Sequence, residues 1–568
     1  MTSSIIFDRL SFSYQNTPVP ALQDICGEMA RGSFTMVMGH SGAGKSTLCC
    51  AINGLVPCFL RGDYAGMVTV EGMEAGKNSV PDMARTVGIV LQDFEAQLFS
   101  TNVELEMAFG LENQCLPRTA MEERISNYLR VVGLEELLRR DTATLSGGQK
   151  QRLAIGSVLA METPVLVMDE PTTDIDPEGR LHILSLIRRL RTRERTLVVT
   201  DLDAEAAVHA DQIWLLKDGR LAAKGSPTEI LTDSSLIESC GIRPLGTIAL
   251  FQAMNWPGQP LTVEDAATEI ENHRLYCPHR QERQAITALA SGKVILETRN
   301  LSYQYPSGAI NALDGIDLTI HEGDFVAMLG QNGSGKTTLA KHFNGLLKPT
   351  AGNMLVRGRA VKDYRRHELA SEVGYVFQNP DHQIFAPTVR EEVAFGPRVL
   401  GMDSKTREDN IAEALDATGL SGFEDRNPFL LNRGERQRVA VASILAVKPA
   451  VIILDEPTTG LDYAHQRDTM EMLKRLNQLG HTIIVITHAM WIAEAYARRS
   501  ILMKEGRILL DGPTSTVFSD EAMLAAASLA PSDLIRLRNR LGLAAITLTG
   551  MVKELRGVHI EFPFSNQR

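Results

Sequence analysis

The sequence lacks any hydrophobic run long enough to cross a membrane. Its longest apolar region extends roughly from Val439 to Leu454, and Lys448 and Pro449 divide it into two short segments. A transmembrane helix needs about 18 or more consecutive apolar residues. We therefore expect no membrane-spanning segment in these 568 residues, and any role at a membrane would have to come through partner proteins.

Basic residues are also in short supply. The chain has 58 lysine and arginine residues against 69 aspartate and glutamate residues, a formal net charge of −11 at pH 7. Broad nucleic-acid binding normally requires a basic surface, so this class of function is disfavoured, although local basic patches are allowed. Apolar residues at 44% and charged residues at 22% are close to the values of soluble globular proteins, which argues against a disordered or collagen-like chain.

Cysteine is scarce, and its spacing does not indicate a disulfide framework. We expect reduced, mostly buried thiols in a reducing compartment. The first residues, MTSSIIFDRLSF, lack the basic start and apolar stretch of a signal peptide, so none is expected. The seven cysteines form no C-x-x-C pair and all lie in the first half of the chain: Cys26, Cys49, Cys50, Cys58, Cys115, Cys240 and Cys277.

The sequence contains an internal repeat: one unit occurs twice. GHSGAGKST at Gly39–Thr47 returns 291 residues later as GQNGSGKTT at Gly330–Thr338. VLVMDEPTTDID at Val165–Asp176 returns as IILDEPTTGLD with an offset of 286 residues. A weaker echo links PLTVEDAATEI, which starts at Pro260, with ITLTGMVKEL. A period this long is too long for a solenoid, so each copy should be a domain with its own core.

The pattern within each copy predicts an α/β fold. Short β-branched runs alternate with helical patterns, which favours a mainly parallel sheet covered by helices. Examples of the buried strands are Thr196–Thr200, Val451–Leu454 and Thr482–Thr487. We predict a first domain with its C-terminal tail over residues 1–272, a short polar and basic linker over 273–293, and a second domain with its tail over 294–568.

Each copy contains a glycine-rich phosphate loop between an apolar strand, FTMVM or FVAML, and a helix. The glycines let backbone N–H groups converge on phosphate oxygens at the positive end of that helix. Lys45 and Lys336 would reach the β- and γ-phosphates, and the Ser46 and Thr337 hydroxyls would bind Mg²⁺. The two predicted loops are Gly39, His40, Ser41, Gly42, Ala43, Gly44, Lys45, Ser46 and Thr47, and Gly330, Gln331, Asn332, Gly333, Ser334, Gly335, Lys336, Thr337 and Thr338.

Two neighbouring carboxylates end a later apolar strand in each copy. Asp169 and Asp455 would lie beside the metal ion. Glu170 and Glu456 follow them directly and could orient and deprotonate the water that attacks the γ-phosphate, which is typically worth about 10²–10⁴ in rate. An isolated Asp-Glu pair is more often a solvated turn, but the buried strand and the upstream phosphate loop favour the catalytic interpretation here.

A third motif, LSGGQKQR at Leu145–Arg152, begins a helix. Ser146 can cap this helix, and Gly147 and Gly148 leave N–H groups exposed at its positive end, followed by Gln149. Together with the preceding motifs, this string resembles the signature of ATP-binding cassette (ABC) ATPases. The resemblance covers nearly the whole chain, twice.

The resemblance implies two P-loop cassettes in tandem, each with an antiparallel β region, a helical subdomain and a C-terminal helical tail. It also implies that the two cassettes clamp two Mg²⁺-ATP molecules head to tail, each between the phosphate loop of one cassette and the signature of the other. The resemblance also implies roles for single residues: Tyr14 and Tyr305 would stack on adenine, Gln92 and Gln378 would link Mg²⁺ to the membrane partner, Asp176 and Asp462 would communicate across the dimer, and His488 would contact the γ-phosphate.

The two copies differ where the family is usually constant. Asp201 stands at the position of His488, and a carboxylate there would repel phosphate by about 4 kcal/mol at roughly 4 Å and an effective dielectric near 20. Asp201 must therefore turn away, be protonated, or weaken catalysis. In the second signature, LNRGERQR, Asn432, Arg433 and Glu435 replace the serine, the first glycine and the glutamine, although Asn432 could still cap its helix.

Head-to-tail pairing would place both departures in the site built on Lys45. We hypothesise that the opposite site, with Lys336, Gln378, Glu456, His488 and the intact signature, hydrolyses ATP, whereas the Lys45 site with Glu170 turns it over slowly. The alternative is that both departures are harmless drift.

A further string, YVFQNPDHQIFAPTVREEVAFGP at Tyr375–Pro397, resembles the ATPase subunits of energy-coupling factor (ECF) importers. In that family, a short helix after the glutamine docks cytoplasmic helices of a membrane T-component, and the tails hold the two ATPases together. The first copy departs from the string at Asp93–Ala96. The matching docking positions are Gln97, Leu98, Phe99, Gln383, Ile384 and Phe385, for whose apolar members core packing is the alternative, and the matching tails are about Ser234–Ile270 and Asp520–Leu555.

The ECF resemblance implies an importer of vitamins, vitamin precursors or metal ions, with T- and S-components as membrane partners and a place on the cytoplasmic face of a bacterial or archaeal membrane. The solute is not encoded in this chain. Two alternatives stay open: a tandem ATPase of another importer, such as one for monosaccharides, and a soluble ribosome-associated tandem ABC protein. The latter usually has a long charged arm between its cassettes, where this chain has about 20 residues.

Overall fold

The computed structural model describes residues 2–15, 17, 19–173, 175, 177–191, 194–273, 292–306 and 311–557. The chain divides into two compact units, one built mostly on residues 2–252 and the other mostly on 292–461 and 465–557. The predicted linker at 273–293 lies almost entirely outside the described residues. We call the two units the first and second cassette.

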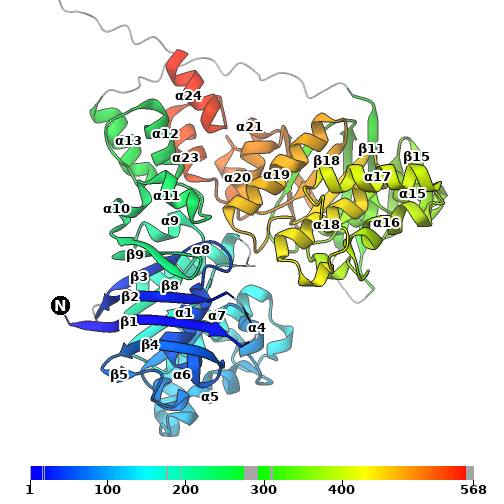
Figure 1. Ribbon diagram of the computed structural model, residues 1–568. Coiled ribbons are helices and arrows are strands. Elements are labelled where there is room, and N and C mark those ends of the chain that lie inside the picture. The colour runs from blue at the N-terminus through cyan, green and yellow to red at the C-terminus, as the bar shows by residue number, and fades with distance from the viewer. Residues whose placement is uncertain are drawn as a thin grey trace, which may run out of the picture. The chain divides into compact units, whose positions relative to one another are not determined.

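Two sheets form the first cassette (Figure 1). The smaller is antiparallel, in the order β2 (Leu22–Ala30), β1 (Ser3–Tyr14), β4 (Gly62–Val70) and β5 (Met73–Glu74). The larger has an antiparallel edge strand followed by five parallel strands, in the order β10 (Arg220–Gly225), β9 (Gln212–Lys217), β3 (Phe34–Met38), β8 (Thr196–Thr200), β7 (Val165–Met168) and β6 (Val87–Val90).

The longer helices of the first cassette either flank the large sheet or form a helical subdomain after β6. Helix α1 (Lys45–Asn53) follows β3, and α8 (Pro177–Leu190) connects β7 with β8. The helical subdomain packs α5 (Val103–Asn113) and α6 (Arg118–Val132) on α7 (Gly147–Ala160). Shorter helices and the tail comprise α2 (Leu55–Cys58), α3 (Val80–Met83), α4 (Phe94–Gln97), α9 (Ala204–Ala207), α10 (Pro227–Leu231), α11 (Ser234–Ser239), α12 (Gly246–Met254) and α13 (Val263–Asn272).

The second cassette repeats this topology. Its antiparallel sheet has the order β12 (Asn311–His321), β11 (Val294–Gln304), β14 (Ala351–Val356) and β15 (Arg359–Ala360). Its large sheet has the order β16 (Val373–Val376), β17 (Val451–Asp455), β18 (Thr482–Ile486), β13 (Phe325–Leu329), β19 (Arg499–Lys504) and β20 (Arg507–Pro513). The helices are α14 (Lys336–Phe343), α15 (Arg366–Glu372), α16 (Val389–Val399), α17 (Ser404–Ala417), α18 (Arg433–Leu445), α19 (Tyr463–Gln478), α20 (Met490–Tyr496), α21 (Thr514–Val517), α22 (Glu521–Ala526), α23 (Asp533–Leu541) and α24 (Leu548–Gly557).

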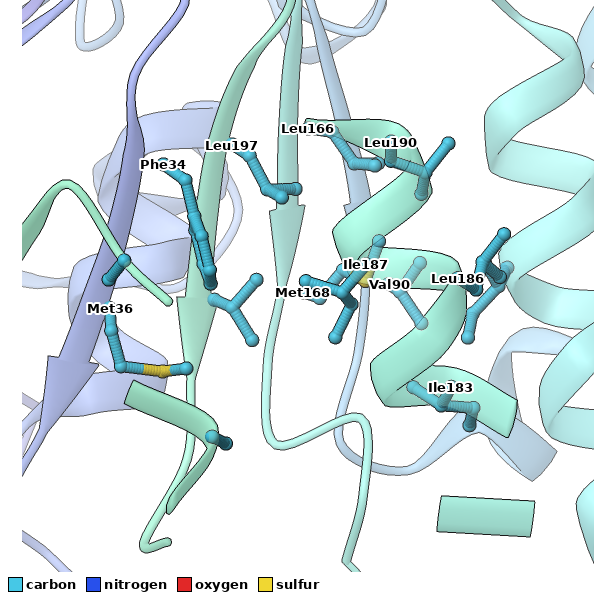
Figure 2. Packing of buried hydrophobic residues seen from close by; sticks show 14 of the residues in the cluster. Phe34, Met36, Val90, Leu166, Met168, Ile183, Leu186, Ile187, Leu190 and Leu197 are labelled. Atoms are coloured by element: carbon cyan, nitrogen blue, oxygen red, sulfur yellow. The ribbon is translucent and has the colours of Figure 1, made fainter. Parts of the chain in front are cut away.

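The strands of each large sheet are apolar on both faces because both faces are covered, one by helices and the other by a helix and the antiparallel sheet. In the first cassette, Ile183, Leu186, Ile187 and Leu190 of α8 pack against side chains of β3, β6, β7 and β8 such as Phe34 (Figure 2). The other face of the same strands packs on α1 and on the antiparallel sheet. Burial on both faces fixes the strand ends in space, and the carboxyl ends of parallel strands are where α/β proteins place their ligands.

The predicted α/β fold with two tandem cassettes is confirmed, and the strands predicted from β-branched runs form β8, β17 and β18. Among the described residues, no helix is both long and apolar enough to span a bilayer. One expectation is wrong: Cys26, Cys58 and Cys115 are exposed rather than buried, because they lie on an outward-facing strand position or next to turns. Cys277 lies outside the described residues.

Candidate nucleotide-binding sites

Each predicted phosphate loop follows the central parallel strand, β3 or β13, and leads into a helix, α1 or α14. Gly39 and Gly330 have φ angles of 154° and 149°. A Cβ at either position would collide with the carbonyl oxygen of Leu216 or Met503 on the neighbouring strand. Only glycine therefore lets the loop fold this closely, which leaves its backbone N–H groups free to surround an anion.

The two predicted phosphate lysines are buried and point back into their own loops. Lys45 Nζ donates to the carbonyls of Gly39 (2.9 Å) and His40 (3.1 Å). Lys336 Nζ donates to Gly330 (2.7 Å), to Gln331 (2.8 Å) and to the Ser334 hydroxyl (3.3 Å). In this position each ammonium group lies beside the loop amides, where phosphate oxygens would bind.

The predicted adenine-stacking residues lie at the same helix ends. The Tyr14 hydroxyl is 3.0 Å from Thr47 Oγ1, and the Tyr305 hydroxyl is 3.2 Å from Thr338 Oγ1. Both rings are only partly covered, and Tyr305 is 40% exposed. The structure thus brings each predicted aromatic residue next to its phosphate loop, from a different sheet.

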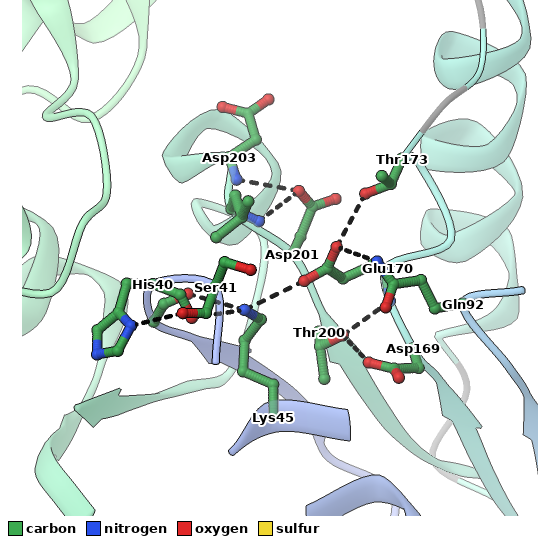
Figure 3. A network of polar contacts seen from close by, with 12 residues as sticks. His40, Ser41, Lys45, Gln92, Asp169, Glu170, Thr173, Thr200, Asp201 and Asp203 are labelled. Atoms are coloured by element: carbon green, nitrogen blue, oxygen red, sulfur yellow. Dashed lines mark hydrogen bonds and ion pairs between the residues drawn. The ribbon is translucent and has the colours of Figure 1, made fainter. Parts of the chain in front are cut away.

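In the first cassette, the two acidic residues after β7 are tied inward (Figure 3). Thr200 donates to Asp169 Oδ1 (2.7 Å) and accepts from the Glu170 amide (2.7 Å). The Glu170 carboxylate is 3.1 Å from Lys45 Nζ and accepts 3.1 Å hydrogen bonds from Gln92 and Thr173. The predicted general base of this cassette is therefore engaged by three side chains.

The second cassette holds its acidic residues differently. Thr337 Oγ1 donates to Asp455 Oδ1 (3.1 Å), and the Tyr375 hydroxyl donates to Asp455 Oδ2 (2.8 Å). Burial raises the pKa of Asp455, and these two hydrogen bonds counter part of that effect. A hydroxyl and a carboxylate in contact are the hard oxygen donors that Mg²⁺ prefers, so the residues present fit the predicted metal site.

Glu456, the predicted general base of the second cassette, lies beside His488. Its Oε1 is 3.0 Å from His488 Nδ1, and Thr459 donates to its Oε2 at 3.5 Å. His488 is 32% exposed on the side chain, whereas Glu456 is only 9% exposed. The carboxylate and the imidazole thus form an adjacent pair.

Asp201, at the position of His488, is turned into its own cassette. Its Oδ2 accepts from the Thr172 hydroxyl (2.6 Å), and its Oδ1 accepts from the amides of Leu202 (2.7 Å) and Asp203 (3.0 Å). Figure 3 shows this carboxylate beside Glu170. Of the three outcomes foreseen from the sequence, turning away from the phosphate is the one that the geometry favours.

Both signature helices are capped despite their different sequences. Ser146 accepts from the Gln149 amide (3.3 Å), and the Gln149 side chain accepts from the Ser146 amide (2.9 Å). Asn432 and Glu435 make the same reciprocal pair at 2.8 and 3.0 Å, so the predicted capping role of Asn432 is confirmed. Glu435 is thus used at the positive end of helix α18.

The remaining departure in the second signature is Arg433, which adds a bulky side chain and leaves the helix start intact. The Arg433 guanidinium lies against Gly460, and the His465 ring lies against Gly434. In α7 the corresponding positions are Gly147 and Gly148, which have no side chains to cover the helix amides. The first signature therefore offers its backbone to a ligand more openly than the second does.

The other predicted residues are placed as follows. Gln378 is exposed at the end of the segment after β16, and Gln92 at the equivalent place reaches Glu170. Ser46 is the second residue of α1 and is partly exposed, and Asp462 directly precedes α19. Asp176 lies outside the described residues. Apart from Asp176, each cassette brings its phosphate loop, its acidic pair and its glutamine to one edge of the large sheet.

Sequence reasoning missed Tyr375. Its hydroxyl touches the predicted metal ligand, and burial together with the Asp455 charge raises the pKa of Tyr375, which keeps the hydroxyl protonated as a donor. A signal was present: the second copy has Gly-Tyr-Val-Phe-Gln where the first has Gly-Ile-Val-Leu-Gln. The polar tyrosine in an otherwise apolar strand, two positions before the phenylalanine, needed a buried partner.

Comparison with known proteins bears on both halves of the chain. A family model described as "ABC transporter" matches residues 22–173 and 313–459. A protein of Caldanaerobacter subterraneus subsp. tengcongensis named as an ABC transporter ATP-binding protein is 46% identical over 558 residues, covering 96% of this chain and 98% of its own. Similarly named proteins of Methanosarcina acetivorans and Enterococcus faecalis are 39% and 33% identical, over 92% and 95% of this chain and 88% and 96% of their own.

Two solved structures are similar to parts of the chain. One is cbiO1 of Clostridium perfringens, part of the ABC transporter complex cbiONQ, with 37% identity and a TM-score of 0.38 over 41% of this chain and 94% of its own. The other is a dimeric ATP-binding cassette in a post-hydrolysis state with ADP and Pi, with 31% identity and a TM-score of 0.36 over 39% of this chain and 99% of its own.

The two ranges that the family model matches include both phosphate loops and both acidic pairs described above. This chain belongs to the ATP-binding proteins of ABC transporters, and it is an ATPase that uses ATP with Mg²⁺.

Proposed function

We propose that the chain is the energy-coupling ATPase of an ECF-type importer, which drives uptake of a vitamin, a vitamin precursor or a metal ion through membrane partners. The observation that carries this proposal is an exposed aromatic residue on the same loop of each cassette. Phe99 is 61% exposed and Phe385 is 59% exposed. These are the positions at which the ECF resemblance places docking of the T-component.

Each of these rings is supported by a second phenylalanine from the following helix. Phe99 and Phe109 have ring centroids 4.5 Å apart, and Phe385 and Phe395 have centroids 4.8 Å apart, both nearly perpendicular. Phe109 and Phe395 are each 45% exposed. A pair of half-exposed rings gives an amphipathic cytoplasmic helix a rigid apolar surface to dock on, and core packing cannot explain their exposure.

A buried glutamate fixes the loop in both cassettes. Glu106 Oε2 accepts from the amides of Phe99 (3.2 Å) and Ser100 (2.8 Å), and Glu392 Oε2 accepts from those of Phe385 (3.0 Å) and Ala386 (2.8 Å). These glutamates are 4% and 2% exposed. A carboxylate buried with two amide donors holds its loop in one conformation, so the phenylalanine is presented in a defined position.

The other predicted docking residues form contacts within their own cassette and help to shape the loop that carries Phe99 or Phe385. Gln97 accepts from the Leu91 amide (3.1 Å), and Gln383 accepts from the Phe377 amide (3.2 Å). Ile384 is buried and Leu98 is half-buried. Direct docking would therefore rest on Phe99 and Phe385, with the two glutamines shaping the turn behind them.

For ATP use, we propose that the Lys336 site is completed by the signature of the first cassette. Lys336 and the loop amides would hold the phosphates, Thr337, Asp455 and Gln378 the Mg²⁺, and Tyr305 the adenine. Glu456 would take the proton of the attacking water, and His488 would contact the γ-phosphate. When bound, Mg²⁺ supplies positive charge that neutralises the developing negative charge on the phosphates.

The Lys45 site would bind nucleotide through its loop and Tyr14, with Ser46, Asp169 and Gln92 toward the metal, but turn it over slowly. Its Glu170 accepts a hydrogen bond from Gln92, and Asp201 replaces the histidine. Completion by the Asn432–Glu435 signature would add the bulk of Arg433. These features together support one hydrolytic and one retaining site.

The organisation that we propose has cassettes over 1–272 and 294–568 joined by a linker at 273–293, with both tails helping to hold an intramolecular pair together. The pair would sit on the cytoplasmic face of the membrane, bound to a T-component and a solute-binding S-component. A tandem ATPase of another importer shares every nucleotide motif, and the docking loop is the feature that distinguishes it.

Purification of the chain with its native membrane partners tests the proposal. We expect a small membrane protein without a solute site and a separate membrane subunit carrying a vitamin, a vitamin precursor or a metal ion. Phe99→Ala/Phe385→Ala should abolish this co-purification, whereas Leu479→Ala, which removes another exposed apolar side chain (75% exposed), should not. Partners that lack a separate solute-binding subunit would instead support another importer class.

A further inference from the structure

A buried tyrosine reaches the predicted metal ligand of the second cassette. Strands β16 and β17 are parallel, with Tyr375 opposite Ile453, and Asp455 lies two residues beyond on the same face. The Tyr375 side chain is 5% exposed, and its hydroxyl donates to Asp455 Oδ2 at 2.8 Å.

The two oxygens of Asp455 consequently face different partners. Oδ2 is held by the Tyr375 hydroxyl, whereas Oδ1 faces the Thr337 hydroxyl at 3.1 Å. Thr337 is the hydroxyl predicted to bind Mg²⁺. The carboxylate is thus held at both oxygens, and Oδ1 lies beside the hydroxyl predicted to bind Mg²⁺.

The first cassette has the same strand register without the hydroxyl. Ile89 of β6 lies opposite Val167 of β7, and Asp169 again lies two residues beyond. Isoleucine cannot donate a hydrogen bond. Asp169 is held instead by Thr200, which donates to Oδ1 at 2.7 Å. The two metal carboxylates are thus oriented by hydroxyls that come from different strands, β16 in one cassette and β8 in the other.

We propose that Tyr375 is a positioning residue for Mg²⁺ in the second cassette, and that Ile89 leaves the first cassette without this support. Mg²⁺ demands near-ideal octahedral geometry, so a carboxylate with a fixed plane binds it better than a free one. Partners that orient metal ligands typically change metal affinity about 10- to 100-fold when removed. The proposal rests on the ATP and Mg²⁺ chemistry of the family and is independent of the importer class.

Tyr375→Phe isolates the hydroxyl from the ring. The ring packs in the core beside Phe377, with centroids 5.2 Å apart, and phenylalanine keeps that packing. The variant is made in the full chain carrying Lys45→Ala, so that the second site is the one that binds. ATP affinity is then measured by fluorescence titration with a labelled ATP analogue, in EDTA and over a Mg²⁺ series.

For Tyr375→Phe, we expect the Mg²⁺ concentration that gives half of the maximal gain in affinity for the analogue to rise about 10-fold or more. The affinity for the analogue in EDTA should stay within about 2-fold of that of the parent chain. Tyr364→Phe is the matched control, because the Tyr364 hydroxyl donates to the Val356 carbonyl at 3.0 Å within the β region. This control should leave the Mg²⁺ dependence unchanged.

An unchanged Mg²⁺ series for Tyr375→Phe, or an equal loss of affinity in EDTA, would overturn the proposal and leave the hydroxyl a purely structural role. If Tyr375→Phe unfolds below the assay temperature, Ile89→Tyr in a chain carrying Lys336→Ala decides the question. If the affinity of the first site for the analogue then reaches half of its maximal gain at a lower Mg²⁺ concentration, the proposal is supported. An unchanged Mg²⁺ dependence contradicts it.

Discussion

The two cassettes share a backbone and differ in how their polar groups are connected. Strand order, the conformation of the phosphate loop and the capping of the signature helix are the same in both. In the first cassette, Glu170 is bound by Gln92, and Asp201 is bound by Thr172. In the second, Glu456 faces His488, and Asp455 faces a threonine and a tyrosine.

This comparison shows that a duplicated scaffold can keep its geometry while its chemistry diverges. The glycines, the strand ends and the caps are required for folding, so both copies keep them. The side chains that would act on the γ-phosphate can be replaced as long as their polar groups find partners within the cassette, as those of Asp201 do.

The largest effect is expected when each of the two predicted general bases is replaced separately by glutamine. Glu456→Gln should lower ATPase activity of the assembled complex by about 10²-fold or more, because the acceptor for the water proton is lost. Glu170→Gln should keep activity within about 3-fold of the parent. Both rates are measured by phosphate release at saturating Mg²⁺-ATP, and the reverse order of effects would show that the first cassette is the hydrolytic one.

Replacing Asp201 should destabilise the protein more than replacing His488, which stands at the equivalent position of the second cassette. Asp201→Ala removes a buried acceptor of three hydrogen bonds and leaves the Thr172 hydroxyl unpaired. This should lower the free energy of unfolding of the first cassette by about 1–3 kcal/mol. His488→Ala, at a partly exposed position, should cost less than about 1 kcal/mol. Chemical denaturation followed by hydrogen exchange of each cassette measures the difference, and equal losses would contradict the structural role given to Asp201.

A smaller effect is expected from the ion pairs that join the segments before Phe99 and Phe385 to helices α7 and α18. Glu95 is 2.8 Å from Lys150 in the first cassette, and Asp381 is 2.9 Å from Arg436 in the second. In the second cassette Gln383 adds hydrogen bonds to Ala440 and Ser443 of helix α18. Gln97 instead donates to Ile89, so the first cassette depends more on its ion pair.

Lys150→Glu should therefore reduce the stimulation of ATPase activity by membrane partners about 1.4- to 5-fold, which corresponds to the value of about 0.2–1 kcal/mol for an exposed ion pair. Arg436→Glu should have a weaker effect. The exchange Glu95→Lys/Lys150→Glu should restore stimulation if the ion pair is responsible. Failure of the double variant to recover would indicate that Lys150 acts through another contact.

The smallest effect is expected from restoring the first site. Asp201→His combined with Asn432→Ser, Arg433→Gly and Glu435→Gln should raise ATPase activity by no more than about 2-fold, since a second hydrolytic site at most doubles the number of turnovers. The measurement is the same phosphate-release assay. A larger gain would mean that the altered groups restrain the Lys336 site as well.

Much of the scaffold could be predicted from the sequence because local patterns determine it. Apolar runs gave the strands, Gly39 and Gly330 marked loops that only glycine can form, and Ser146 and Asn432 marked helix starts. Asp201 and Arg433 could be identified as departures by aligning the two copies. These features depend on residues close together in the chain.

What the sequence could not provide depends on side chains from distant segments. The contact of Tyr375 with Asp455 spans 80 residues, and that of Thr172 with Asp201 spans 29. The exposure of Phe99 and Phe385 follows from the buried glutamates that hold their loops. The exposure of Cys26 follows from its outward-facing strand position, and that of Cys58 and Cys115 from the turns beside them. Such placements are decided by tertiary packing.

Vanadate trapping tests the central claim, one hydrolytic site per chain, most directly. The assembled complex is incubated with vanadate, Mg²⁺ and a radiolabelled photoreactive ATP analogue, irradiated, and cleaved between residues 273 and 293. We predict hydrolysis-dependent labelling of the second half alone, where Tyr305 would hold the base of the nucleotide being hydrolysed. Equal vanadate-dependent labelling of both halves would contradict the account.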